Sequence, residues 1–195
     1  MKIAAIIVAA GCSTRFAGGN KLLANVKGRP LIHYVVSAVC ASPLDDIVLV
    51  TAADGDKIAA AAGAGRWRRA VNPNARNGLS SSLQTGLASL DTDATGALIV
   101  LADMPRLTSD IIASLCDAFV ACKGTAIVFP QTIDGRQGNP VLWPRSLFAE
   151  LMALSGDAGG KAILTRHPEL HCPVTASGDA TLFDVDTIDD LSPNA

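Results

Sequence analysis

The sequence predicts an α/β fold in which a mostly parallel sheet carries helices on both faces. Apolar runs rich in β-branched residues, such as residues 3–8 and 97–101, are typical of strands buried on both faces. These runs alternate with helical patterns, which implies right-handed crossovers between parallel strands. Hydrophobic residues make up 49% of the chain and charged residues only 17%, so the composition can fill a large core.

The N-terminal part predicts strands and helices in strict alternation. A polar loop that contains glycine follows the first strand, and Pro30 opens the first helix. The expected elements are, in order, a strand over residues 3–8, a loop over 11–20, a helix over 30–41, a strand over 47–51, a helix over 54–62 and a strand limited to 70–71.

The middle of the chain continues the alternation. Thr108 is a suitable N-cap for the helix expected over residues 109–121, with Asp110 favourable in its first turn. The expected elements are a helix that carries Leu83, Leu87 and Leu90, a strand over residues 97–101, a helix over 109–121 and a strand over 126–129.

The regular alternation of strand and helix patterns ends after Pro130. Residues 135–143 predict a tight loop that feeds a short strand, as a hairpin or a small β extension of the sheet. Short helices are expected over residues 146–153 and 160–166, and the tail over residues 182–191 is expected to form a short strand and an acidic helix start. No repeat or linker interrupts the sequence, which predicts one domain over residues 1–195.

Composition and charge limit the possible partners. The chain has 16 basic and 18 acidic residues and no basic block, which argues against nucleic acid or an anionic membrane as a partner. Five scattered cysteines indicate neither a disulfide framework nor a zinc site, so a reducing cytoplasm is the expected location. The apolar N-terminus is short for a signal peptide and is interpreted as the first strand.

The loop after the first strand is a candidate phosphate-binding site. Small residues there let a ligand approach backbone N–H groups, and two cations follow them, a combination suited to a triphosphate. The pattern differs from the two common glycine-rich nucleotide-binding motifs, and an ordinary surface loop with two solvated charges is the alternative. The candidate residues are Ala9, Ala10, Gly11, Ser13, Arg15 and Lys21.

Asp103 is a candidate metal ligand. It follows the strand over residues 97–101 and so belongs to the same sheet edge as the first loop. A carboxylate at this edge can hold a Mg²⁺ ion that bridges phosphate oxygens, whereas the simpler alternative is an Asp that begins a turn. Asp184 or Asp186 in the tail could supply a second ligand, because both would point the same way from a strand. Asp189 and Asp190 have a structural explanation in a helix first turn capped by Thr187.

Six ordered segments together resemble the MobA-like nucleotidyltransferases, which include the molybdenum cofactor cytidylyl- and guanylyltransferases. The resemblance covers nearly the whole chain. In order, the segments are residues 8–16 followed by Asn20 and Lys21, residues 72–82, residues 102–105, residues 135–140, residues 156–161 and residues 184–187. It implies the Rossmann-like, nucleotide-diphospho-sugar transferase type of α/β fold, with residues 1–130 binding the nucleotide and residues 131–195 binding the acceptor and completing the metal site.

The resemblance also implies roles for individual residues. Arg15, Lys21 and Asp103 would be catalytic, and Mg²⁺ would be held by Asp103 with Asp186 or Asp184. Asn72, Gly78 and Ser81 would join the first loop in binding the nucleotide, and the acceptor would be bound by Gly138, Asn139, Asp157 and Gly159. Ala9-Ala10-Gly11 is similar to the cytidylyltransferase branch, because the guanylyltransferases tend to carry a second glycine there. Asn139 stands where the family commonly has a His, so the identity of the acceptor stays open.

The expected reaction is transfer of CMP from CTP to the phosphate of molybdopterin, with release of pyrophosphate. A transient contact with a molybdoenzyme or its chaperone is also implied. Three alternatives remain open at this point: a guanylyltransferase that uses GTP, a sugar- or polyol-phosphate nucleotidyltransferase, and a nucleotide-binding chaperone that delivers cofactor without catalysis.

Overall fold

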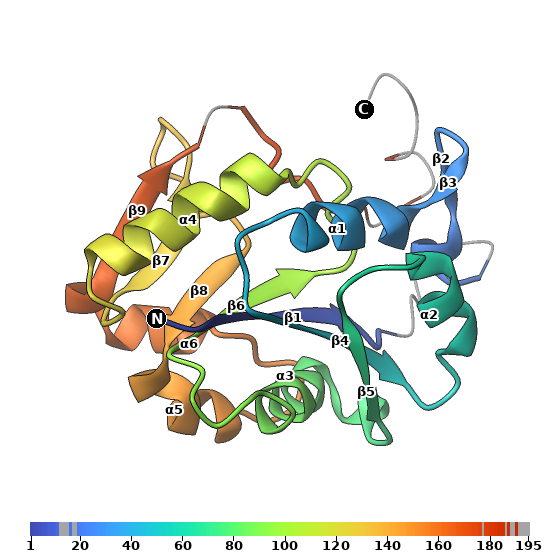
Figure 1. The fold of residues 1–195 in the computed structure, drawn as a ribbon, viewed down its shortest axis with the longest axis horizontal. Coiled ribbons are helices and arrows are strands. Elements are labelled where there is room, and N and C mark those ends of the chain that lie inside the picture. Colours follow the sequence, from blue (N-terminus) through green and yellow to red (C-terminus); the bar gives the residue numbers. More distant parts are fainter. Residues whose placement is uncertain (12–15, 17–18, 177, 186, 188–189, 191–195) are drawn as a thin grey trace.

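A seven-stranded sheet forms the centre of the protein (Figure 1). The computed structural model describes residues 1–11, 16, 19–176, 178–185, 187 and 190. The strand order is β5-β4-β1-β6-β8-β7-β9. The strands are β1 (Ile3–Ala9), β4 (Asp46–Ala52), β5 (Arg68–Asn72), β6 (Gly96–Leu101), β7 (Ile127–Gln131), β8 (Val141–Pro144) and β9 (His171–Thr175).

All strands of this sheet except β8 run in the same direction. β1 pairs in parallel with β4 and β6, β4 with β5, and β7 with β9. β8 is antiparallel to both of its neighbours, β6 and β7. Two short strands, β2 (Asn25–Val26) and β3 (Arg29–Pro30), form a separate hairpin. The predicted mostly parallel sheet is therefore confirmed.

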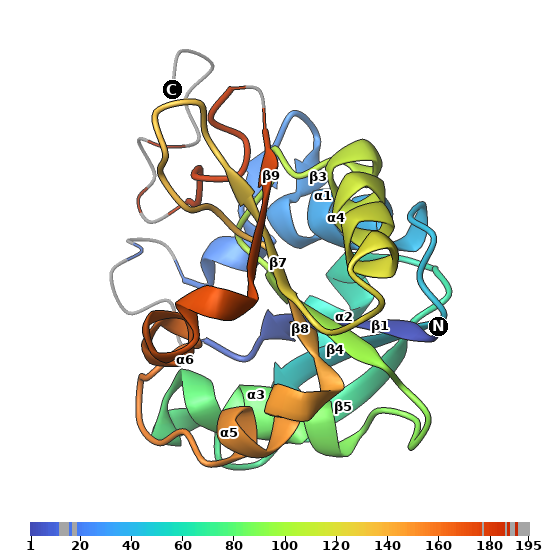
Figure 2. The ribbon, with the colours of Figure 1, turned by 90° about the vertical axis from the view of Figure 1, so that its left-hand side faces the viewer.

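Helices cover both faces of the sheet (Figures 1 and 2). On one face lie α1 (Leu31–Cys40), α2 (Asp56–Ala62) and α4 (Ser109–Ala121). On the other lie α3 (Leu79–Ala88), α5 (Phe148–Met152) and α6 (Lys161–Arg166). Short 3₁₀ turns connect them: η1 (Lys21–Leu23), η2 (Ala75–Asn77), η3 (Arg145–Leu147) and η4 (Pro168–Leu170). Within the described residues, no helix is long and apolar enough to cross a membrane.

The alternation of side chains along β1 divides the core into two layers. Ile3, Ala5 and Ile7 pack into the layer beneath α1, α2 and α4, whereas Ile6 packs into the layer beneath α3, α5 and α6. Successive strand residues point to opposite faces, so a strand buried on both faces must be apolar at every position. Burying each Ile or Leu stabilises the fold by about 1.5–3 kcal/mol. The continuous apolar run of β1 is explained by this two-sided burial.

Most expected elements of the first 130 residues are present, with three corrections. The strand limited to residues 70–71 is wrong, because β5 has five residues and its exposed Arg68 pairs with Asp46 of β4 (Nη2–Oδ2 2.7 Å). The helix expected to carry Leu90 ends at Ala88, before that residue. The helix expected from residue 54 begins at Asp56.

The C-terminal third departs further from expectation. The short strand expected after residues 135–140 is present as β8 and joins the main sheet, but its place between β6 and β7 was not predicted. β9 was not expected at all; its burial alternates weakly at the sheet edge, and it contains Pro173. The strand expected after residue 182 is wrong, because the described residues Phe183, Asp184 and Val185 have no strand structure. Asp190 accepts hydrogen bonds from both the N–H (2.7 Å) and the hydroxyl (2.9 Å) of Thr187.

Candidate active site

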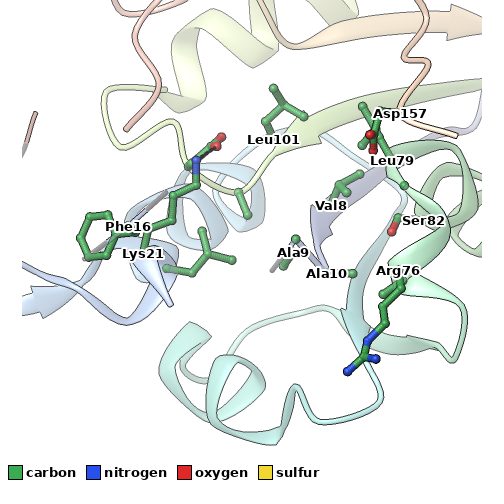
Figure 3. A pocket seen from close by; sticks show the side chains of 16 residues that line it. Val8, Ala9, Ala10, Phe16, Lys21, Arg76, Leu79, Ser82, Leu101 and Asp157 are labelled. Carbon is green, nitrogen blue, oxygen red and sulfur yellow. Dashed lines mark ion pairs between the residues drawn. The ribbon is translucent and has the colours of Figure 1, made fainter. Parts of the chain in front are cut away.

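A pocket of about 420 Å³ lies at the carboxyl ends of β1 and β6 (Figure 3). Open α/β sheets bind their ligands at this edge, and the volume is within the range of small-molecule sites. The residues after β1, the turn η1, the start of α3 and the residues after β6 form its walls. The predicted site residues that line it are Ala9, Ala10, Gly11, Lys21, Gly78, Asp103 and Asp157.

Lys21 is placed in the pocket by a capped turn. The Asn20 side chain accepts a hydrogen bond from the N–H of Leu22 (3.0 Å), which caps η1. Leu22 is buried in the core, so the turn is anchored to the sheet. Lys21, between these two residues, extends its ammonium toward the end of β6 (Figure 3). The order of these two residues is therefore explained: Asn20 caps the turn, and Lys21, which follows it, reaches into the pocket.

Asp103 lies opposite Lys21 at the end of β6. The N–H of Ala102 donates to the carbonyl of Val8 (3.2 Å), which continues the contact of β6 with β1 up to the residue before Asp103. The Lys21 Nζ lies 2.6 Å from Asp103 Oδ2, and each side chain is 17% exposed. The other carboxylate oxygen of Asp103, Oδ1, is buried and has no hydrogen-bond partner within the described residues.

The tail of the chain returns to this point. The N–H of Val185 donates to the backbone carbonyl of Asp103 (3.0 Å), and Lys21 Nζ donates to the carbonyl of Val185 (2.7 Å). Val185 itself is fully buried. The exposed Asp184 directly precedes Val185 in the sequence and is therefore one residue away from the contact with Asp103. Asp186 lies outside the described residues.

The oxygen atoms at this point fit a magnesium ion. Mg²⁺ takes oxygen ligands and is usually held by one or two carboxylates together with substrate phosphates. Within the described part of the chain the buried Oδ1 of Asp103 has no partner, and a buried carboxylate oxygen of this kind costs free energy until a cation or donor satisfies it. Among the described residues, no group of three or more His, Cys, Asp or Glu side chains is arranged so that it could hold a metal ion. Phosphate oxygens of a bound ligand could complete the coordination of such an ion.

The start of α3 forms the opposite wall through Gly78. Gly78 has φ +91°, and a Cβ at this position would clash with the carbonyl group of Gly156 and lie 2.6 Å from Asp157 Oδ1. Ser80 donates both its N–H (3.1 Å) and its hydroxyl (2.7 Å) to the Gly156 carbonyl. The contact with Gly156 brings the next residue, Asp157, to the pocket wall, although it lies 79 positions after Gly78 in the sequence (157 − 78).

Asn72 and Ser81 do not line this pocket. Asn72 is buried, and its amide donates to the hydroxyls of Ser81 (2.9 Å) and Ser82 (3.0 Å). Its oxygen accepts from the N–H of Asn74 (2.9 Å). Both predicted residues border a second hollow of about 270 Å³ beside α3. Through Ser82, which does line the pocket, Asn72 braces the first turn of α3.

The predicted acceptor residues are distributed over two places. Gly138 and Asn139 precede β8, and the Asn139 N–H donates to the carbonyl of Thr181 (2.8 Å). The β8 register, with Val141 opposite Ile99, puts them at the same sheet edge as Asp103, although neither lines the pocket. Gly159 lies near the α3 wall, because a Cβ there would be 3.4 Å from Leu79 Cδ2.

Other predicted residues lie outside the described part of the chain, and some pocket residues were not predicted. Ser13 and Arg15 belong to residues 12–15, which the structure does not describe. Phe16, Arg76 and Ser82 line the pocket without having been given individual roles, although they and Leu79 belong to the segments 8–16 and 72–82 that carry the family resemblance. Ser82 follows Gly78 by four residues, so a helix starting at Gly78 would have placed both on one face.

The fold and the pocket together define a class of protein. Glycine and small residues, a lysine and a metal-competent aspartate meet at the carboxyl edge of a mostly parallel sheet, which is the arrangement of an α/β enzyme that handles nucleotides. A family model with the description MobA-like NTP transferase domain matches residues 5–171. The chain belongs to this family and is a nucleotidyltransferase.

Individual relatives are similar to this chain in sequence or in structure over more than half of its length. The nicotine blue oxidoreductase of Paenarthrobacter nicotinovorans is 26% identical over 97% of this chain and 94% of its own length. The bifunctional protein GlmU of Sorangium cellulosum is 30% identical over 58% of this chain, which spans only 25% of that protein. The crystal structure of Rv0371c from Mycobacterium tuberculosis is similar with a TM-score of 0.83 at 26% identity, covering 97% of this chain and 95% of the other.

Proposed function

We propose that the protein transfers CMP from CTP to the phosphate of molybdopterin or its molybdenum-loaded form, and releases pyrophosphate. The observation that carries the proposal is the convergence of Lys21 and Asp103 (Nζ–Oδ2 2.6 Å) on one pocket at the edge of the sheet. A cation and a metal-competent carboxylate at one point suit a metal-bound triphosphate.

The proposed chemistry needs positioning and charge neutralisation more than proton transfer. The acceptor phosphate oxygen is already anionic when it attacks the α-phosphorus, and the bond from that phosphorus to the β-phosphate oxygen breaks. Lys21 would bind the α-phosphate or the departing pyrophosphate, and Arg15 the β- and γ-phosphates. Preorganised charges of this kind commonly supply a large part of the rate enhancement.

Asp103, together with Asp184 or Asp186, would hold Mg²⁺. The bound ion would neutralise charge on the phosphate oxygens and hold them in line for the displacement. The carboxylate of Asp103 supports this assignment, because its Oδ1 has no hydrogen-bond partner among the described residues and its Oδ2 already contacts a cation, Lys21. The carbonyl of Val185, fixed beside Asp103 by the Val185 N–H, is a further oxygen at the same place.

The proposed preference for CTP is supported by the residues at the carboxyl end of β1. Ala9 and Ala10 are buried and line the pocket. The methyl group of Ala10 takes up space that a glycine would leave open, so a compact pyrimidine is the better fit than a purine. Gly138, Asn139, Asp157 and Gly159 would bind the acceptor from the C-terminal side.

The experiment combines each of four nucleoside triphosphates with Mg²⁺ and molybdopterin and measures pyrophosphate. Turnover with CTP above GTP supports the cytidylyltransferase, and the reverse order supports a guanylyltransferase. Release with sugar or polyol phosphates, but not with molybdopterin, would replace the acceptor. Nucleotide binding without any pyrophosphate would contradict catalysis and favour a cofactor-delivery chaperone. An oxidoreductase reaction, which the name of one relative suggests, would also release none.

A further inference from the structure

The ammonium group of Lys21 lies between two oxygen atoms that suit a metal ion. Its Nζ is 2.6 Å from Asp103 Oδ2 and 2.7 Å from the carbonyl oxygen of Val185. A carboxylate and a backbone carbonyl are the kinds of hard oxygen ligand that divalent cations take in proteins. Lys21 therefore makes, with its own positive charge, contacts that a metal at Asp103 would need.

This arrangement is built into the fold on all three sides. The Asn20 cap and the buried Leu22 fix the turn that carries Lys21. The bond from the Val185 N–H to the Asp103 carbonyl fixes the second oxygen relative to the first. Both charged side chains are largely shielded from water, so their attraction is stronger than that of an exposed pair. The contact between Lys21 and Asp103 is therefore held in place by the surrounding fold.

We propose that Lys21 closes the metal site to free divalent cations, so that the metal enters together with the nucleotide. The proposal rests on the proposed function, because it assumes that Asp103 binds the metal. Two cations repel each other at one pair of oxygens, so a metal can bind only after the ammonium has left. The triphosphate offers the ammonium other anionic oxygens within reach of its flexible four-carbon stem. The substrate form that the site accepts is thus the metal–nucleotide complex.

The proposal predicts reciprocal coupling between metal and nucleotide. Without nucleotide, the apparent metal affinity equals the intrinsic affinity multiplied by the fraction of molecules in which Lys21 has left Asp103, and that fraction is small. Nucleotide that draws Lys21 away raises metal affinity, and by linkage the metal raises nucleotide affinity by the same factor.

The test measures binding of Mn²⁺, from the electron paramagnetic resonance signal of the free ion, without any turnover. Lys21→Met removes the ammonium but keeps the length of the side chain, and Lys21→Gln keeps a donor toward Val185. Arg76→Met is the matched control, because Arg76 is a cation that lines the same pocket. Without nucleotide, both Lys21 variants should bind Mn²⁺ at least ~10-fold more tightly than the wild type, and Arg76→Met should stay within ~3-fold.

Wild-type affinity should rise at least ~10-fold when a CTP analogue with a non-cleavable α,β-bridge is added, after the Mn²⁺ bound by the analogue in a protein-free sample has been subtracted. Equal Mn²⁺ affinity of the wild type and both Lys21 variants would overturn the proposal, as would an equal gain in Arg76→Met. Asp103→Asn separates this failure from that of the proposed function. If the tight Mn²⁺ binding of Lys21→Met survives the added Asp103→Asn change, the metal is not at Asp103, and both proposals fall.

Discussion

Gly78 lies so close to Gly156 that no side chain fits between them. A Cβ on Gly78 would clash with the carbonyl carbon and oxygen of Gly156, and Ser80 donates two hydrogen bonds to that same oxygen. The contact joins the start of α3 to the segment before α6. It is one of the places where the part of the chain after residue 130 meets the wall of the pocket.

We expect Gly78→Ala to destabilise the protein more than Gly135→Ala. Both glycines have positive φ (+91° and +86°), but no atom of the described residues lies within 4 Å of a Cβ at Gly135. Gly135→Ala therefore measures the cost of the backbone conformation alone. The clash at Gly78 should add about 1–3 kcal/mol, measured as the free energy of unfolding in urea. Equal losses in the two variants would show that the Gly156 segment moves aside without cost.

Lys21→Ala and Asp103→Ala should each lower turnover at least ~100-fold, because each removes a preorganised charge from the site. Circular dichroism should show that both variants remain folded. Lys2 and Asp93 form a second lysine–aspartate pair, but an exposed one and at the amino end of β1. Lys2→Ala and Asp93→Ala should keep turnover within ~2-fold. Near-normal rates in both site variants would contradict the site assignment.

The packing of α3 on β1 should depend on the absence of a side chain at Gly86. A Cβ there would clash with Cγ2 of Ile6 and lie 3.2 Å from Cγ2 of Val50. Gly86→Ala should cost about 1–3 kcal/mol in the free energy of unfolding, and Ile6→Ala about 2–5 kcal/mol. Because Ile6→Ala makes room for the new methyl group, the double variant should lose at least ~1 kcal/mol less free energy of unfolding than the two single variants lose together. Strict additivity would mean that α3 shifts instead.

Stability should fall at high pH partly through Cys116. Burial, with smaller effects of Asp117 and Asp45, raises the pKa of this thiol from 9.0 to about 11. The folded state therefore favours the neutral thiol, so this contribution is complete below pH 9.0 and is lost as the pH rises toward 11. Urea unfolding of the wild type and Cys116→Ala at a series of pH values measures it. The stability difference between them should shrink by as much as about 2 kcal/mol across that window.

The sequence predicted those features of the fold that depend on local pattern. The apolar run of β1 and the strand before Asp103 are continuous, and two neighbouring parallel strands must end at the same edge. Lys21 and Asp103 could therefore be placed together from sequence. Their direct contact could not, because it depends on the capped turn at Asn20 and on Val185, which arrives from the other end of the chain.

Features that depend on packing between distant segments were not predictable in this way. β9 is short, half-exposed and contains Pro173, so its pattern resembles a loop. Arg76 and Ser82 line the pocket because η2 and α3 pack there. Asn72 fits a nucleotide contact in a motif, but in the structure its amide is committed to Ser81 and Ser82. A motif gives the order of residues, whereas the direction of each side chain follows from tertiary contacts.

The position of β8 has a consequence for how the chain is made. Because β8 runs between β6 and β7, a ribosome that has released only the first 130 residues has produced two strands without the one that joins them. Each would present unpaired N–H and C=O groups to other nascent chains. Cutting the gene at this point to obtain a separate nucleotide-binding fragment would therefore yield aggregates, and rapid synthesis through residue 144 would protect the emerging polypeptide.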